Sequence, residues 1–220
     1  MFFHLTPCSL IFSFLGIVIF NACTLKSEKK LPILGPKELA AKHIKGTNIS
    51  DTIYHTIHDF EFINQDGKKV NNQTFEDKIY VCNFIFTSCP TICPVMTQQM
   101  YRVQEAYTDN SELMFLSHSV DPDRDSAQVL KNYAQKNKAQ PDKWHFVTGN
   151  KDEIYRMGLK NYMITLDEDE AAPGGFLHSA AFILVDKERR VRGVYNGTDE
   201  TEVNQLIEDI KILLQEYENL

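Results

Sequence analysis

The sequence has no excess of positive charge and only modest numbers of glycine and proline. It contains 23 Lys and Arg against 30 Asp and Glu, a formal net charge of −7, and no block of basic residues stands out. This balance argues against a nucleic-acid surface. With 10 Gly, 8 Pro and 43% hydrophobic residues in a chain of 220, the composition is that of an ordinary globular protein. We therefore expect one domain with a tail.

The apolar run at residues 10–20 is too short to span a bilayer comfortably, but it has the length of a signal-peptide core. It leads into Phe20-Asn21-Ala22-Cys23, which resembles the site where bacterial lipoproteins are cleaved and lipidated on cysteine. We expect a signal peptide at 1–22 and, at 23–50, a lipidated anchor on Cys23 with a flexible tether. The chain would then be an exported, membrane-anchored lipoprotein with its domain in the periplasm. Because Phe20 and Asn21 are unusual at such a site, a plain cleaved signal or an N-terminal anchor helix stays open.

The five cysteines fall into different groups. Cys8 lies in the expected signal peptide, Cys23 is the expected lipidation site, and Cys82 sits in an apolar run where a thiol packs as a small hydrophobic group. Cys89 and Cys93 remain, in the stretch IFTSCPTICPVM. In an exported protein two such cysteines could form a structural disulfide, so composition alone does not assign them a role.

Strands and helices alternate from about residue 53. The continuous apolar run at 78–86 is typical of a strand buried on both faces, and we expect it at the centre of the sheet. The pattern around it predicts a hairpin at 58–70, helices at 94–107, near 126–138, near 151–160 and at 201–217, and strands at 112–120, 144–147, 180–186 and 191–195. This order predicts an α/β fold, with a mixed central sheet flanked by helices and an N-terminal hairpin extension.

Cys89 and Cys93 follow a predicted strand and open a predicted helix. At a helix N-terminus the unpaired backbone N–H groups and the dipole favour thiolates, so both thiols should be reactive. Pro94 suits the first helical turn, where its missing N–H costs nothing. The spacing of four would place the two sulfurs about one turn apart, where they could hold one ion or close a disulfide. Thiolates suit Cu(I), Zn or Fe–S, and two thiolates with one imidazole match copper.

Four histidines are candidates for the third ligand. His118 alternates within a predicted buried strand and is better explained as a hydrogen-bonded core or edge residue. His55 and His58 precede the hairpin and are better explained as surface or hairpin-packing residues. His178 lies in a glycine-rich loop before a strand, where α/β folds carry chemistry, and is the preferred ligand.

Four blocks, in order, carry a resemblance to a known family: FIFTSCPTICPVM, LSHSVDPDRDS, DKWHFVTGN and FLHSAAFILVD. Together they resemble the Sco (SenC/PrrC) family of thioredoxin-fold copper proteins over about residues 52–216. The resemblance implies a thioredoxin-like Sco domain at 51–220 and a copper ion held by Cys89, Cys93 and His178. It also implies a role in supplying copper to, or reducing the thiols of, the dinuclear copper site in a cytochrome c oxidase subunit.

Two positions depart from the family pattern. Thr91 stands where members often have an acidic residue between the cysteines, and Leu177 stands where they often have an aspartate before the histidine. Without these hard oxygen donors we expect a softer site that prefers Cu(I) to Cu(II). The acidic residues at 167–170 could supply a carboxylate, but a solvated loop explains them more simply.

The block DPDRD superficially resembles the start of a calcium-binding loop. Position six of such a loop is Ser126 rather than Gly, and position twelve is Asn132 rather than Glu, so calcium is rejected. Asp125 or Ser126 is instead expected to cap the following helix.

Four functions are weighed. The first is a copper metallochaperone, which is not an enzyme. Its partners would be the oxidase copper-site subunit and other copper or thiol-redox proteins, and its N-terminal lipid would attach it to a membrane. The second is a thiol-disulfide oxidoreductase in which Cys89 and Cys93 are catalytic. A thiol peroxidase ranks third, because such enzymes usually carry Thr three residues before the reactive cysteine, where this chain has Phe86. A purely structural disulfide is the fourth.

Overall fold

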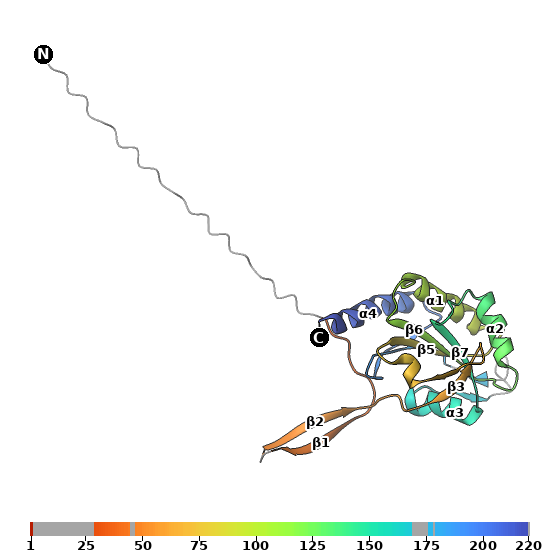
Figure 1. Cartoon of the computed structure of the whole chain (residues 1–220), viewed down its shortest axis with the longest axis horizontal. Coiled ribbons are helices and arrows are strands. Elements are labelled where there is room, and N and C mark those ends of the chain that lie inside the picture. Colours follow the sequence, from red (N-terminus) through yellow and green to blue (C-terminus); the bar gives the residue numbers. More distant parts are fainter. Residues whose placement is uncertain (2–28, 45–46, 169–175, 178, 220) are drawn as a thin grey trace.

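A seven-stranded mixed sheet forms the centre of the molecule (Figure 1). The computed structural model describes Met1 and residues 29–44, 47–168, 176–177 and 179–219. The strands lie in the order β11-β10-β5-β6-β7-β3-β4, with β5, β6 and β7 parallel and the outer strands antiparallel to their neighbours. Their bounds are β3 Glu61–Asn64, β4 Lys69–Asn71, β5 Ile79–Ile85, β6 Leu113–Ser119, β7 Trp144–Thr148, β10 Ala181–Val185 and β11 Val191–Asn196.

The predicted central strand is confirmed. Every residue of β5 and of its parallel neighbour β6 is buried, as expected for strands covered on both faces. On its other side β5 pairs with β10, which runs antiparallel to it. The start of β10 therefore lies at the same end of the sheet as the C-terminal ends of β5 and β6.

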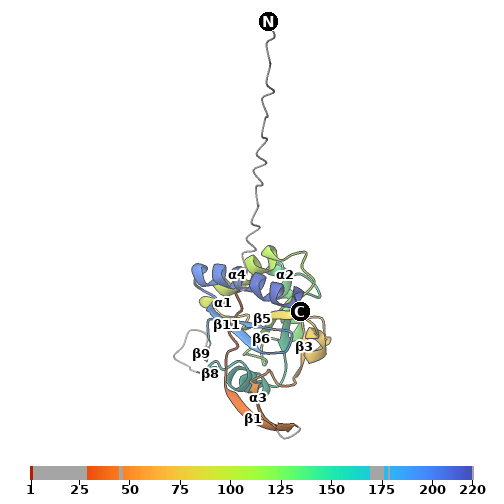
Figure 2. The ribbon, with the colours of Figure 1, turned by 90° about the vertical axis from the view of Figure 1, so that its left-hand side faces the viewer.

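Helices cover both faces of the sheet. Because β5, β6 and β7 are adjacent in chain order and such crossovers are right-handed, α1 and α2 must lie on one face. Figure 2 shows α1, α2 and α4 on that side of the sheet and α3 on the other. The bounds are α1 Ile92–Ala106, α2 Ala127–Lys136, α3 Lys151–Arg156 and α4 Glu200–Glu218, with short helical turns at Asn72–Phe75 (η1) and Met157–Asn161 (η2).

The C-terminal helix α4 follows the predicted apolar stripe. Asp199 begins it by accepting the backbone N–H of Thr201 at 2.7 Å. Its buried residues are Val203, Leu206, Asp209, Ile210, Leu213 and Leu214. The helix is amphipathic, and no helix in the described part of the chain is long and apolar enough to cross a bilayer.

A two-stranded antiparallel hairpin, β1 Lys37–Ile44 and β2 Thr47–Tyr54, projects from the body of the domain (Figure 1). The sequence analysis did not predict these strands, because it assigned 23–50 to an anchor and tether. The segment just before the hairpin, at residues 29–34, is hydrogen-bonded to the domain. Leu34 donates its N–H to the carbonyl of Val191 at 2.8 Å, so this segment runs beside β11.

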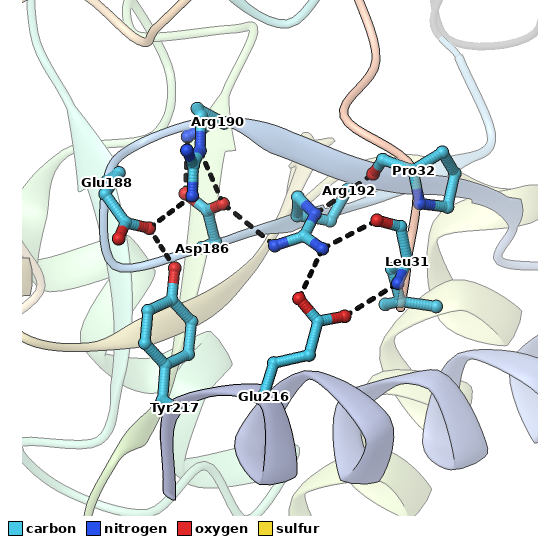
Figure 3. Close-up of polar contacts among 8 residues, drawn as sticks. All are labelled: Leu31, Pro32, Asp186, Glu188, Arg190, Arg192, Glu216 and Tyr217. Atoms are coloured by element: carbon cyan, nitrogen blue, oxygen red, sulfur yellow. Dashed lines mark hydrogen bonds and ion pairs between the residues drawn. The ribbon is translucent and has the colours of Figure 1, made fainter. Parts of the chain in front are cut away.

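Arg192 holds the same N-terminal segment to the C-terminal helix (Figure 3). Its guanidinium donates to the carbonyl of Leu31 at 2.7 Å and to that of Pro32 at 3.0 Å. It also forms ion pairs with Asp186 at 3.1 Å and with Glu216 of α4 at 2.7 Å. Glu216 in turn accepts the backbone N–H of Leu31 at 2.6 Å. We call residues 29–34 the N-terminal strap.

Candidate metal centre

The two motif cysteines lie where β5 passes into α1. Cys89 is in the turn before the helix, and Cys93 is in its first turn, followed by Pro94. The expected position at a helix N-terminus is therefore confirmed. Both residues are buried, with Cys89 6% and Cys93 1% exposed, and both are thiols that are not joined in a disulfide.

The sulfur of Cys89 takes part in starting the helix. Thr91 is the N-cap residue of α1, but its side chain accepts no capping hydrogen bond. Instead the Cys89 sulfur accepts the backbone N–H of Cys93 at 3.4 Å and lies 3.7 Å from the hydroxyl oxygen of Thr91. The two cysteines thus come together through a turn and a helix start, not as neighbours one turn apart on a finished helix.

The surroundings make the two thiols unequal. Burial raises the pKa of Cys89, but hydrogen bonds from Thr91 and Cys93 outweigh it, so the pKa of Cys89 is lowered overall. Burial raises the pKa of Cys93 strongly, and the neighbouring Cys89 and Asp125 raise it further. Cys89 is therefore the thiol that ionises first.

A buried carboxylate fixes the loop that leads to Cys89. Asp125, which is 1% exposed, accepts the backbone N–H of Thr87 at 3.0 Å and the hydroxyl of Thr87 at 2.5 Å. It also accepts the hydroxyl of Ser119, at the end of β6, at 2.6 Å. The sequence analysis offered Asp125 or Ser126 as a helix cap. Ser126 is the residue that caps α2, by accepting the N–H of Val129 at 3.4 Å.

Three of the four candidate histidines lie away from the thiol pair. His118 is fully buried on β6, between the rings of Phe84 (4.8 Å, stacked) and Phe62 (5.2 Å, edge-on). The expectation of a core residue is confirmed, but the expectation that its ring is hydrogen-bonded is wrong. Neither ring nitrogen has a partner among the described residues, because aromatic side chains surround it.

His55 and His58 pack at the surface near η2. The ring of His55 contacts the carbonyl oxygen of Asn161 at 2.8 Å, and the backbone N–H of His58 donates to the side chain of Asn161 at 2.6 Å. This agrees with the packing role expected for both.

The preferred third ligand, His178, and the expected lipidation site, Cys23, lie outside the described residues. Within the described part of the chain no three His, Cys, Asp or Glu side chains are grouped so that they could hold a metal ion. The residues just after His178 are described: Ala180 accepts the N–H of Gly197 at 2.7 Å and leads into β10. Because β10 is antiparallel to β5, this entry point lies at the end of the sheet where β5 ends.

Cys82 is separate from the pair. It is completely buried on β5, and burial raises the pKa of its thiol well above the ordinary value. It packs as a small hydrophobic residue, as the sequence indicated.

Comparisons with known proteins agree with this architecture. The family described as SCO1/SenC matches residues 50–215. The SCO1 protein homolog of Bacillus subtilis (strain 168) is 33% identical over 168 residues, which are 76% of this chain and 86% of that protein.

Solved structures agree as well. A SCO1/SenC family lipoprotein from Bacillus anthracis str. Ames has 32% identity and a TM-score of 0.67, covering 73% of this chain and 95% of that one. BsSco, described as a member of the Sco family of cytochrome c oxidase assembly proteins with a disulfide switch, has 33% identity and a TM-score of 0.65, covering 72% and 93%. Arabidopsis thaliana ScoI with copper bound has 26% identity and a TM-score of 0.60, covering 72% and 98%.

The matched residues span the whole sheet, the thiol pair and the helices around them, and the fold is thioredoxin-like. The chain belongs to the SCO1/SenC family.

Proposed function

We propose that this protein binds copper and acts as a metallochaperone that supplies it to the dinuclear copper site of a cytochrome c oxidase. The observation that carries the proposal is the hydrogen bond from the backbone N–H of Cys93 to the sulfur of Cys89, which holds the two cysteines together at the start of α1. Thiolates are soft donors that suit Cu(I), and these two cysteines lie side by side where β5 passes into α1. Support also comes from a relative that has copper bound and from one described as an oxidase assembly protein.

His178 is the proposed third ligand. The chain enters β10 at the end of the sheet where β5 ends, three residues after His178, which favours an imidazole from this loop as the partner of the thiols. A site of two thiolates and one imidazole would leave copper accessible to the cysteines of a client by ligand exchange. Copper binding requires Cys93 to release its proton, because the metal ligand is the thiolate.

The location of this activity is part of the proposal. Lipidation of Cys23 would anchor an exported protein to the membrane, with the domain in the periplasm. The relative from Bacillus anthracis is described as a lipoprotein, which supports the anchor. Radiolabelled palmitate incorporated into the full chain, but not into Cys23→Ser, would be the expected result, and equal labelling of both would contradict it.

The alternative function is a thiol-disulfide oxidoreductase, which the unequal pKa values of the two thiols favour. The Cys89 thiolate would attack a client disulfide and form a mixed disulfide, releasing one client thiolate. Cys93, after losing its proton, would then displace the second client thiolate and close a Cys89–Cys93 disulfide. The client is reduced by two electrons and the cysteine pair is oxidised by two. The disulfide switch described for BsSco supports this reading.

Anaerobic titration of the reduced full-length chain in detergent with Cu(I) tests the chaperone proposal. The expected result is one copper per chain, with two sulfur neighbours and one nitrogen neighbour by X-ray absorption. His178→Ala should abolish tight binding and leave dithiol exchange with a model disulfide intact, while the exposed control His58→Ala should change neither. No copper binding by the wild type would overturn the chaperone function, and tight binding by His178→Ala would remove that histidine from the site.

A further inference from the structure

Asp125 joins the two loops that leave the central strands. Thr87 lies in the loop after β5, two residues before Cys89, and Ser119 is the last residue of β6. The Asp125 carboxylate accepts both polar hydrogens of Thr87, at 3.0 and 2.5 Å, and the hydroxyl of Ser119 at 2.6 Å. One oxygen atom of this carboxylate therefore bonds to both loops.

We call the group of hydrogen bonds that Asp125 makes to Thr87 and Ser119 the Asp125 anchor. It is buried. Asp125 is 1% exposed, and within the described part of the chain no cationic side chain forms an ion pair with it. The neighbouring Arg124 pairs instead with Asp121, at 3.5 Å. A buried carboxylate needs compensating donors, and here the donors are those of Thr87 and Ser119.

The loop before α1 is also held by short-range contacts among its own residues and the start of the helix. Cys89 donates its backbone N–H to the carbonyl of Phe86 at 3.2 Å, which is a contact within the loop itself. The N-cap side chain of Thr91 makes no capping hydrogen bond. These contacts join Cys89 to its neighbours in the chain, whereas the hydrogen bonds of Thr87 to Asp125 join the same loop to the end of β6.

We propose that Asp125 is a positioning residue: through its hydrogen bonds to Thr87 it sets the position of the Cys89 sulfur relative to Cys93. This inference deepens the proposed function and rests on it where copper is concerned. Mutating a residue that orients a metal ligand through hydrogen bonds typically weakens metal binding about 10- to 100-fold. Loss of the Asp125 anchor should weaken copper binding by a similar factor.

Four variants separate hydrogen bonding from charge and from stability. Asp125→Ala removes the anchor, and Asp125→Asn keeps its shape and its ability to bond Thr87 and Ser119 without the charge. Thr87→Val removes only the hydroxyl on the thiol side of the anchor and keeps the backbone N–H. Ser119→Ala, the matched control, removes only the hydroxyl on the β6 side.

Two readouts on the full chain test the proposal. The first is the Cu(I) dissociation constant by competition with a chelator. The second is amide hydrogen exchange in the reduced, metal-free protein at Thr87 and Cys89. Asp125→Ala should weaken copper binding about 10- to 100-fold, and Thr87→Val should weaken it less. Both should speed exchange at these two amides. Ser119→Ala and Asp125→Asn should stay within about 3-fold of wild type in affinity.

Each outcome decides something. If wild type binds no copper, the proposed function fails, and the exchange rates still test the anchor. If wild type binds copper but Asp125→Ala and Thr87→Val bind it as tightly as Ser119→Ala does, the positioning role is wrong. If Asp125→Asn loses as much affinity as Asp125→Ala, charge rather than hydrogen bonding is responsible, and the proposal in this form is overturned. Should Asp125→Ala fail to fold, Thr87→Val decides alone.

Discussion

The backbone N–H of Cys93 donates to the sulfur of Cys89 across 3.4 Å, so the helix that carries the second thiol stabilises negative charge on the first. A hydrogen bond to the charged form of a group favours ionisation, whereas burial opposes it. At Cys89 the hydrogen bonds outweigh burial and the pKa is lowered, whereas at Cys93 burial dominates and the pKa is raised.

This inequality predicts that Cys89 is alkylated first. Since the pKa of Cys89 is lowered and that of Cys93 is raised, iodoacetamide at pH 7 should modify Cys89 at least about 10-fold faster. Mass spectrometry of peptides from the reduced, metal-free protein after timed quenching measures both rates. Cys93→Ser removes the second thiol but keeps the N–H that bonds the Cys89 sulfur, so Cys89 in this control should remain fast. Equal rates at the two cysteines would show that the assignment of the nucleophile is wrong.

The sequence predicted those parts of the fold whose cause is local. The strand at Ile79–Ile85 is continuous in apolar residues, and helix α4 repeats them at helical spacing, so each element is visible without its neighbours. The β1–β2 hairpin was missed because its strand sequences, KELAAKHI and TNISDTIY, do not alternate polar and apolar residues clearly, and the pair Lys45-Gly46 between them is not a typical hairpin turn such as Asn-Gly.

The site was predictable as far as its chemistry follows from residue type and spacing. Two cysteines between a buried strand and a helix predicted two reactive thiols at a helix start. The position is confirmed, but the lowered pKa that favours a thiolate is found only at Cys89, because burial raises the pKa of Cys93. The role of Asp125 was not predictable, because its partner Thr87 is 38 positions away and only the parallel pairing of β5 and β6 brings the two loops together. The environment of His118 was hidden for the same reason, since its aromatic neighbours come from separate strands.

His118 predicts a loss of stability in acid. Burial lowers the pKa of His118 to about 3, whereas in an unfolded chain it is about 6.5. Below pH 6.5 the unfolded state therefore binds a proton that the folded state does not. The stabilisation is complete above pH 6.5 and is lost as the pH falls toward 3, at up to about 1.4 kcal/mol per pH unit. Between pH 7 and pH 5 this residue should cost about 2 kcal/mol.

His118→Phe measures that contribution. It removes two buried nitrogens without partners and keeps an aromatic ring against Phe84, so it should raise the free energy of unfolding at pH 7 by about 1 kcal/mol. The gain over wild type should grow to about 3 kcal/mol at pH 5. Urea unfolding at pH 7 and at pH 5 measures both gains. Burial also lowers the pKa of His145, but this residue is present in wild type and variant alike, so it does not change the difference between them. A gain for His118→Phe that is the same at both pH values would contradict the prediction.

Position 91 predicts a change of copper preference. The hydroxyl oxygen of Thr91 lies 3.7 Å from the sulfur of Cys89, so a carboxylate there can reach an ion held by that sulfur. Hard oxygen donors favour Cu(II) over Cu(I). Thr91→Asp should therefore tighten Cu(II) binding about 10-fold and leave Cu(I) binding nearly unchanged. Separate titrations with each oxidation state measure this.

Ser88→Asp is the matched control for Thr91→Asp. Ser88 is exposed in the same loop, so this variant adds the same charge nearby. If Ser88→Asp tightened Cu(II) binding as much as Thr91→Asp, the effect would be general electrostatics. If neither variant did so, the absence of a carboxylate at position 91 would not explain a preference for Cu(I).

The contacts of Arg192 predict that the N-terminal strap, residues 29–34, stabilises the domain. Arg192 is 4% exposed, so removing its cation takes the ion pair from Glu216, leaves Asp186 paired only with Arg190, and frees the carbonyls of Leu31 and Pro32. Arg192→Met should lower the free energy of unfolding by about 3 kcal/mol and speed trypsin cleavage after Lys30. Lys69→Met, which breaks the exposed pair with Glu61, is the matched control and should change both quantities little. If Arg192→Met matched this control in urea unfolding and in cleavage rate, the strap would not depend on Arg192.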